Sequence, residues 1–235
     1  MRAVIFDWGG TLTPWLTVDH TQGWRAYADA LHPDDPDRAA ELADAIRLAE
    51  AAAWGRVRTE HRAFTIGQVL EAAGAPADEE AFRAYRDFWE HATYTDPEVP
   101  DMVEALRARG LRTGVLSSTS WPATWHEEWL HRDGVLDLFD ALVWSSDLEY
   151  TKPHRDAFLA AMTAVGIDDP ADCVYVGDRM FDDVSGAQAA GMRTVFIPNS
   201  DIPAAQLVPV DARPDATIRR LADLPAVVEP WLSRH

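Results

Sequence analysis

Two patterns in the sequence predict an α/β fold with a parallel sheet. From residue 97 onward, short and continuously apolar segments alternate with segments whose apolar residues recur every three to four positions. Such strand–helix repeats, with strands buried on both faces, are typical of a doubly wound, Rossmann-like core. Residues 15–94 show only the helical pattern. We therefore expect an all-helical domain at 15–94, inserted into a core formed by residues 1–14 and 95–235.

The individual elements follow from apolar periodicity and from helix and strand breakers. The first strand is predicted at residues 3–7, where an apolar segment ends at two glycines. Helical periodicity, interrupted at HPDDPD, near Gly55 and at GAPADE, predicts helices at 24–31, 38–54, 64–74 and 79–92. Later strands are expected at 112–118, 141–146, 173–177 and 194–198. The helices between and after them are expected at 103–110, 123–134, 154–166, 183–192 and 218–232.

Composition and charge narrow the classes of function. The 235 residues carry 39 acidic and 21 basic side chains, a formal net charge of −18. Surfaces that bind nucleic acid or anionic membranes need a basic footprint, so we expect neither partner. The single Cys173 excludes an intramolecular disulfide, and no apolar stretch reaches the length of a membrane span. With no signal segment before the first strand, we expect a cytoplasmic monomer or homodimer.

Polar residues follow four of the predicted strands at the point where each strand ends. These residues are Asp7, Gly9, Gly10 and Thr11; Ser117, Ser118 and Thr119; Lys152; and Asp178, Asp182 and Asp183. The carboxyl ends of parallel strands lie at the same edge of a sheet, so we expect one shared site. Lys152 is the single lysine of the chain, which makes its place in this set conspicuous.

The carboxylates in this set indicate a divalent cation. Asp7 and Asp178 supply the hard oxygen ligands that Mg²⁺ prefers, with waters and a substrate phosphate completing the shell. Either Asp183 or Asp182 is placed to hold one of those waters. Lys152 offsets the charge of the carboxylates and of an incoming phosphoryl group.

The same set suits a phosphorylated small molecule. Gly10, Thr11 and Ser118 lie where backbone N–H groups and hydroxyls can bind phosphate oxygens. With the charges screened, one carboxylate oxygen of Asp7 can attack phosphorus and form an aspartyl-phosphate, which water then hydrolyses.

Four ordered segments resemble the motifs of the haloacid dehalogenase superfamily. They are VIFDWGGTL, GVLSST, LEYTKPHRDAF and VYVGDRMFDDVSGAQAAGM, and the helical insertion resembles that family's helical cap. The resemblance implies a hydrolase that uses Asp7 as nucleophile, Ser117 to bind phosphoryl oxygens and Lys152 to steady the intermediate. It also implies a Mg²⁺ site whose ligands are Asp7, the Gly9 carbonyl, Asp178 and Asp183.

Gly9 departs from the family pattern. In the family's phosphatases this position carries an aspartate that protonates the leaving oxygen, an effect that typically contributes about 10²–10⁴-fold. The haloacid dehalogenases have tyrosine there but lack the metal-binding acids that this chain keeps. Phosphonoacetaldehyde hydrolases have alanine and need a cap lysine, whereas residues 15–96 contain no lysine.

Three interpretations of Gly9 follow. The chain is a phosphatase for substrates with good leaving groups, or one that borrows an acid from the cap, with Asp19 and His20 as nearest candidates. Alternatively, it is a relative that cleaves C–P or C–halogen bonds. The third interpretation is a catalytically impaired protein kept for binding or regulation, although so many like charges in a disused site would cost stability.

Two further features bear on the site. The densest basic cluster consists of Arg56, Arg58, His61 and Arg62. It either faces the cleft and binds an anionic part of the substrate or forms a solvated helix start. An aromatic stripe consists of Trp121, Trp125 and Trp129, which is more typical of a core or a subunit contact than of a ligand site. Trp8 either shapes the mouth of the pocket or packs beneath the cap.

Overall fold

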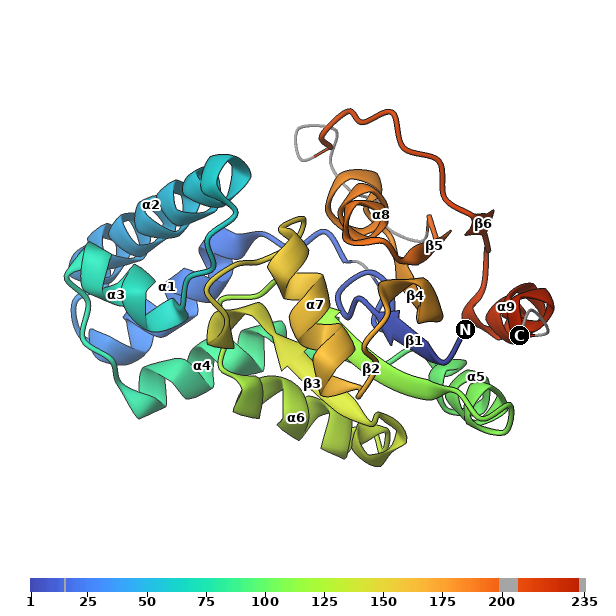
Figure 1. Cartoon of the computed structure of the whole chain (residues 1–235). Coiled ribbons are helices and arrows are strands. Elements are labelled where there is room, and N and C mark those ends of the chain that lie inside the picture. The colour runs from blue at the N-terminus through green and yellow to red at the C-terminus, as the bar shows by residue number, and fades with distance from the viewer. Residues whose placement is uncertain (15, 199–206, 233–235) are drawn as a thin grey trace.

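The computed structural model describes residues 1–14, 16–198 and 207–232. Within these residues, six strands form one parallel sheet in the order β3-β2-β1-β4-β5-β6 (Figure 1). The strands are β1 (Ala3–Phe6), β2 (Arg112–Ser117), β3 (Ala141–Trp144), β4 (Cys173–Gly177), β5 (Arg193–Phe196) and β6 (Ala216–Thr217). The doubly wound parallel α/β fold predicted from the sequence is thereby confirmed.

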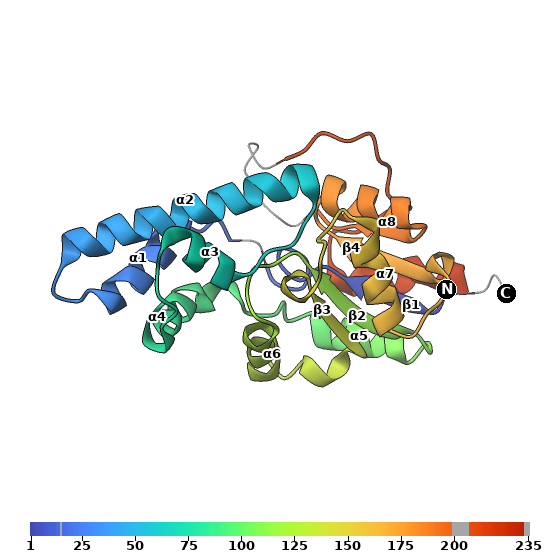
Figure 2. The same ribbon diagram turned by 60° about the vertical axis from the view of Figure 1, so that its left-hand side comes forward.

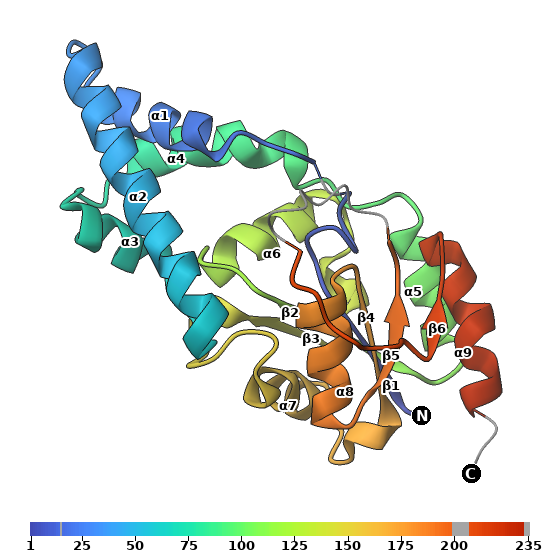
Figure 3. The same cartoon turned by 90° about the horizontal axis from the view of Figure 1, so that it is seen from above.

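Helices occupy the connections between the strands. Between β1 and β2 the helices are α1 (His20–Leu31), α2 (Pro36–Glu60), α3 (Ile66–Ala73), α4 (Glu79–Trp89), η1 (Glu90–Ala92) and α5 (Val99–Arg107). After β2 they are α6 (Ala123–Arg132), η2 (Leu136–Leu138), η3 (Ser145–Asp147), α7 (Arg155–Ala164), η4 (Pro170–Asp172), η5 (Met180–Ser185), α8 (Gly186–Ala190), η7 (Leu221–Asp223) and α9 (Leu224–Leu232). Helices α1 to α4 lie together beside the sheet, whereas α5 and α9 pack on it (Figures 1 and 3).

Both faces of the sheet are covered, as the continuously apolar strands require. In β1, Val4 and Phe6 pack into one core with α5, α6 and α9. The alternate residues Ala3 and Ile5 pack into a second core with α7 and α8. This two-residue alternation places the strand interiors out of water on each side.

The two largest departures from the predicted boundaries lie in α2 and in the final helix. A helix break was expected near Gly55, but α2 runs through it to Glu60. The buried side chains of Ile46, Ala53 and Val57 keep helical spacing across Gly55, and this packing outweighs the roughly 1 kcal/mol that a helical glycine costs. The final helix begins at Leu224 rather than near residue 218, because the preceding residues form the short strand β6 and a 3₁₀ turn.

The interior of the helical insertion is continuous with one core of the sheet. Tyr85 and Trp89 on α4 contact Trp121, which lies just before α6. Trp125 and Trp129 on α6 are both buried. The tryptophan stripe is therefore core, and it joins the insertion to the sheet through aromatic contacts.

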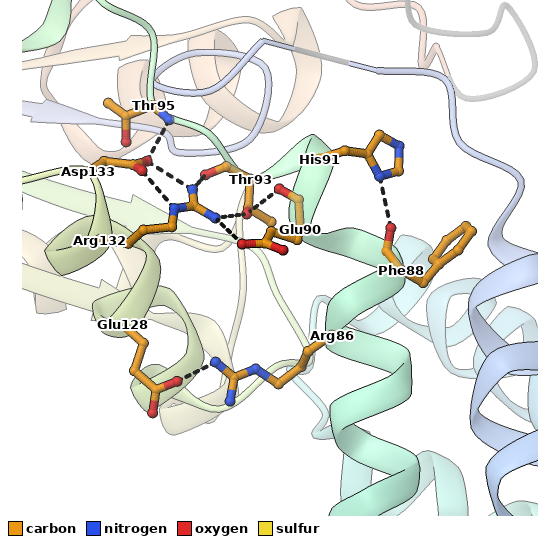
Figure 4. Close-up of polar contacts among 9 residues, drawn as sticks. All are labelled: Arg86, Phe88, Glu90, His91, Thr93, Thr95, Glu128, Arg132 and Asp133. Carbon is orange, nitrogen blue, oxygen red and sulfur yellow. Dashed lines mark hydrogen bonds and ion pairs between the residues drawn. The ribbon is translucent and has the colours of Figure 1, made fainter.

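The return segment from the insertion to α5 is fixed to the end of α6 (Figure 4). The Arg132 guanidinium donates to the Thr93 carbonyl at 3.0 Å and to the Asp133 carboxylate at 2.7 and 3.0 Å. Asp133 also accepts the Thr95 N–H at 2.8 Å. Arg86 of α4 also forms an ion pair with Glu128 of α6. These contacts hold the insertion against the sheet domain at this side.

No helix in the described part of the chain combines the length and apolar character needed to cross a lipid bilayer.

Buried Glu50 provides a pH-dependent test of the insertion's interior. Its carboxylate accepts the Trp24 Nε1–H at 2.8 Å, and burial raises the pKa of Glu50, with smaller opposing effects from Trp24 and His20. The folded protein then keeps this proton to higher pH than the unfolded chain, so its stability falls as pH rises through the folded-state pKa.

We expect Glu50→Gln to remove this loss while keeping an acceptor for Trp24. Urea unfolding should show the variant gaining stability relative to wild type between pH 5 and pH 8. Exposed Glu71→Gln on α3 is the matched control and should show no such gain. If Glu50→Gln changes the free energy of unfolding by the same amount at pH 5 and at pH 8, the prediction is wrong.

Candidate active site at the strand ends

The ends of β1, β2 and β4 lie at one level of the sheet. Phe6 is opposite both Val115 of β2 and Val176 of β4, and the Asp7 N–H donates to the Val176 carbonyl at 2.9 Å. Asp7 and Asp178 therefore follow β1 and β4, and Ser117 is the last residue of β2, all at the same edge of the sheet.

The loop after β1 is a tight turn built around one carbonyl. The Trp8 carbonyl accepts the N–H groups of Leu12 and Thr13 at 2.9 and 3.0 Å. Gly10 has φ +85°, and a Cβ at this position would lie 2.4 Å from Oδ2 of Asp178. Glycine at position 10 thus permits both the left-handed turn and the close approach of a carboxylate.

Lys152 joins the site through two ion pairs. Its Nζ lies 2.8 Å from Oδ1 of Asp7 and 2.7 Å from Oδ1 of Asp183, and all three side chains are buried. Burial lowers the pKa of Lys152, but the charges of Asp183 and Asp7 outweigh it and raise that pKa well above its ordinary value. Lys152 therefore stays a cation at the centre of the site.

Three buried carboxylates form a candidate metal site. Oxygen atoms of Asp7, Asp178 and Asp183 all lie within 4.8 Å of one another. Burial raises the pKa of Asp183 to about 8, with Lys152 opposing the shift and Asp7 and Asp178 adding to it. Even with Asp183 protonated, Lys152 faces the carboxylates of Asp7 and Asp178, which leaves excess negative charge, and hard oxygen donors at this spacing fit a divalent cation.

The structure also distinguishes Asp183 from its neighbour. Asp183 is completely buried, and its second oxygen accepts the Arg179 N–H at 2.8 Å. Asp182 is only partly buried and belongs to no three-residue cluster among the described residues. Of the two acids left open by the sequence, Asp183 lies with Asp7 and Asp178.

Hydroxyl groups border the same edge. Ser117 is buried at the end of β2, and the Thr11 hydroxyl is buried without a hydrogen-bond partner in the described structure. The Ser118 hydroxyl accepts a hydrogen bond from Thr151 Oγ1 at 2.7 Å. Thr151 was not among the residues predicted from the sequence. Its position directly before Lys152 was the available signal.

The Trp8 side chain is buried against aromatic rings of α6. Its ring stacks on Trp129 at 6.0 Å between centroids and meets His126 edge-on at 4.6 Å. His126 is fully buried, with Nε2 3.0 Å from the Thr119 hydroxyl, and burial lowers its pKa to about 3. A neutral histidine thus supports the loop that follows Ser117, a role that the sequence gave no specific reason to expect.

Each of the two acid candidates at the start of the insertion has a contact within the insertion. Asp19 is exposed and caps α1 by accepting the Thr21 N–H at 3.0 Å. The His20 ring packs edge-on against Trp89, 5.0 Å between centroids. The space beside Gly9 is open, since a Cβ there would meet no atom within 4 Å.

Residues 1–191 match the family model described as haloacid dehalogenase-like hydrolase. The chain belongs to this family. The match confirms the family predicted from the four motifs, and it identifies the protein as a hydrolase.

Relatives with assigned names include two phosphatases. Phosphoglycolate phosphatase of Escherichia coli is 29% identical over 212 residues, covering 83% of this chain and 80% of that enzyme. Glyceraldehyde 3-phosphate phosphatase of Methanopyrus kandleri is 35% identical over 101 residues, covering 43% of this chain and 42% of that enzyme.

Solved structures share the fold over almost the whole chain. A HAD phosphatase from Thermococcus onnurineus superposes with a TM-score of 0.67 at 22% identity, covering 97% of this chain and 98% of that one. A 2-haloacid dehalogenase from Pseudomonas syringae gives a TM-score of 0.64 at 26% identity, covering 98% and 99%. Both proteins share the fold of this chain, but their names describe different reactions, that of a phosphatase and that of a dehalogenase.

The adjacent glycines after Asp7 offer a matched pair of substitutions. Gly10→Ala should lower the free energy of unfolding by about 1–3 kcal/mol, because it strains a left-handed residue and crowds Asp178. Gly9→Ala should be nearly neutral, since its methyl group enters open space. Urea denaturation measures both values, and equal destabilisation by the two variants would show that the turn is not built as described.

Proposed function

We propose that this protein is a Mg²⁺-dependent phosphatase that acts on a small phosphorylated metabolite through an aspartyl-phosphate on Asp7. The observation that carries the proposal is the contact of Asp7 with Lys152 inside a buried carboxylate cluster. The names of the relatives, which act on phosphoglycolate and glyceraldehyde 3-phosphate, support a small anionic phosphate ester as substrate.

The proposed metal ligands are Asp7, the Gly9 carbonyl, Asp178 and Asp183. When bound, Mg²⁺ supplies positive charge that offsets the carboxylates and the phosphoryl oxygens. Ser117, Ser118, Gly10 and Thr11 are proposed to bind those oxygens through hydroxyl and N–H groups. The buried Thr11 hydroxyl, which lacks a partner in the described structure, supports this role because such a group costs free energy unless it is satisfied.

In the proposed reaction, a carboxylate oxygen of Asp7 attacks phosphorus and the bond from phosphorus to the leaving oxygen breaks. Lys152 holds one oxygen of Asp7 at 2.8 Å, which orients the carboxylate and offsets the negative charge of the transferred group. Water then attacks the phosphorus of the aspartyl-phosphate, releasing phosphate and regenerating Asp7. We propose that helices within residues 15–94 act as a cap over these steps.

The retained acids argue for catalysis over a binding function alone. Asp178 and Asp183 lie beside Asp7, and Lys152 pairs with two of these three buried acids. Burying this many like charges is costly without a cation, so a protein kept only for binding has no physical use for them. A catalytically impaired regulatory protein and a relative that cleaves C–P or C–halogen bonds remain the alternatives that the experiments separate.

The first test removes the nucleophile. Asp7→Asn should abolish hydrolysis of an aryl phosphate, and EDTA should abolish wild-type activity until Mg²⁺ is restored. The exposed acid Asp44→Asn on α2 is the control and should match wild type. Metal-independent phosphatase activity, or activity that survives in Asp7→Asn, would refute the proposed chemistry.

The second test restores the missing acid. Gly9→Asp places a carboxyl group in open space two residues after Asp7. Where no other residue donates the proton, turnover of alkyl phosphates should rise by about 10-fold or more, because poor leaving groups need a proton, whereas aryl phosphate turnover should change little. Measured kcat values for both substrate classes decide the matter, and equal increases would show that protonation was not the limiting deficit.

A further inference from the structure

The C-terminal end of the long helix α2 meets the loop that carries Lys152. The Thr151 N–H donates to the His61 carbonyl at 2.9 Å, and the Ala63 N–H donates to the Glu149 carbonyl at 3.0 Å. An antiparallel bridge between Arg62 and Tyr150 lies between these bonds. The insertion therefore reaches the catalytic loop by main-chain hydrogen bonds immediately before Lys152, and Figure 2 shows this end of α2 directed toward the sheet domain.

His61 ends the helix in an unusual conformation. Its φ of 54° is positive, and it is the one non-glycine residue with positive φ in the described part of the chain. Among non-glycine residues this left-handed region is uncommon and somewhat more accessible to Asn, Asp and His. The conformation turns the chain from α2 onto the catalytic loop, so the basic cluster around His61 forms a helix end and not the helix start considered from the sequence.

The His61 side chain faces the segment that carries the metal-site acids. Its ring centroid lies 6.4 Å from that of Phe181, in the first turn of η5, which also contains Asp182 and Asp183. Burial raises the pKa of Asp182; Lys152, Arg179 and His61 oppose that shift, whereas Asp7 adds to it. The His61 ring thus lies against the segment that carries Asp183, and its carbonyl is bonded to Thr151 beside Lys152, which places His61 at the border of the site.

Other ionisable groups near this border already have partners. Glu149 on the catalytic loop pairs with Arg62 at 2.8 Å. Tyr150 stacks on the His154 ring at 3.8 Å. Deeper in the insertion, the Glu50 carboxylate is bound to Trp24. From η5, the side chain that contacts the His61 ring is the uncharged Phe181.

We propose that His61 contacts the leaving group of the substrate and supplies the proton that the residue at Gly9 cannot. This inference rests on the proposed phosphatase function. In this proposal His61, at the end of α2, has the acid–base role that Gly9 in the loop after β1 cannot fill.

The proposed step balances as follows. As Asp7 bonds to phosphorus, the bond between phosphorus and the leaving oxygen breaks and its electron pair stays on that oxygen. The imidazolium of His61 gives its proton to this oxygen, which departs as an alcohol. Neutral His61 then takes a proton from the water that attacks the aspartyl-phosphate, which restores the imidazolium and the Asp7 carboxylate.

The test compares His61→Asn with His32→Asn, a matched change at the C-cap of α1 on the same insertion. Asparagine tolerates the left-handed conformation, so the backbone bonds to the catalytic loop are retained. We expect kcat for alkyl phosphates to fall by about 10²-fold in His61→Asn, with little change for aryl phosphates. His32→Asn should match wild type for both.

Two further measurements exclude a merely structural role. Histidine changes charge between pH 5 and 8, so the fall of wild-type kcat for alkyl phosphates with rising pH should be absent in His61→Asn. The double variant carrying His61→Asn and Gly9→Asp should recover alkyl phosphate turnover, because the new carboxyl group takes over the proton transfer.

The possible outcomes are distinct. Equal losses for aryl and alkyl phosphates, an unchanged pH profile, or failure of Gly9→Asp to rescue would overturn the role of His61. If wild type hydrolyses phosphates in an Asp7- and Mg²⁺-dependent manner in those cases, the proposed function stands without it. Absence of that activity in wild type would instead overturn the proposed function.

Discussion

The paired contacts of Lys152 with Asp7 and Asp183 are the constraint on which the site depends. They join the segments after β1, β3 and β4 through buried side chains at distances of 2.7 and 2.8 Å. Removing one member of such a buried set leaves an uncompensated charge, so the set behaves as a unit. The parallel sheet supplies the common edge, and Gly10 permits the β1 loop to approach Asp178 closely.

This arrangement separates two parts of the proposed chemistry. Nucleophile, lysine and metal-site acids come from the sheet domain, where packing on both faces fixes their positions. Gly9 has no side chain that could donate a proton to the leaving group. We propose that His61, at the end of α2, is this donor. The main-chain hydrogen bond between His61 and Thr151 ties the position of this donor to the loop that carries Lys152.

The sequence predicted the sheet and the strand ends well because both have strong local signals. Continuously apolar strands, with Asp7, Ser117 and Asp178 at or directly after their ends, leave little choice of topology once the helices between them are recognised. The course of α2 past Gly55 was missed, because tertiary packing of Val57 overrides a local preference of about 1 kcal/mol. Because α2 was predicted to end before Gly55, the sequence also gave no indication that His61 lies at the end of this helix. Likewise, the inward packing of Trp8 depends on His126 and Trp129, whose proximity no local pattern encodes.

The most direct measurement is a crystal structure of the protein grown with Mg²⁺ and beryllium fluoride, which mimics a phosphoryl group on a carboxylate. The account predicts beryllium fluoride bonded to an Asp7 oxygen, with Lys152 beside it and the cation held by Asp7 and Asp178. A cation bound elsewhere, or beryllium fluoride absent from Asp7 at saturating concentration, would contradict it.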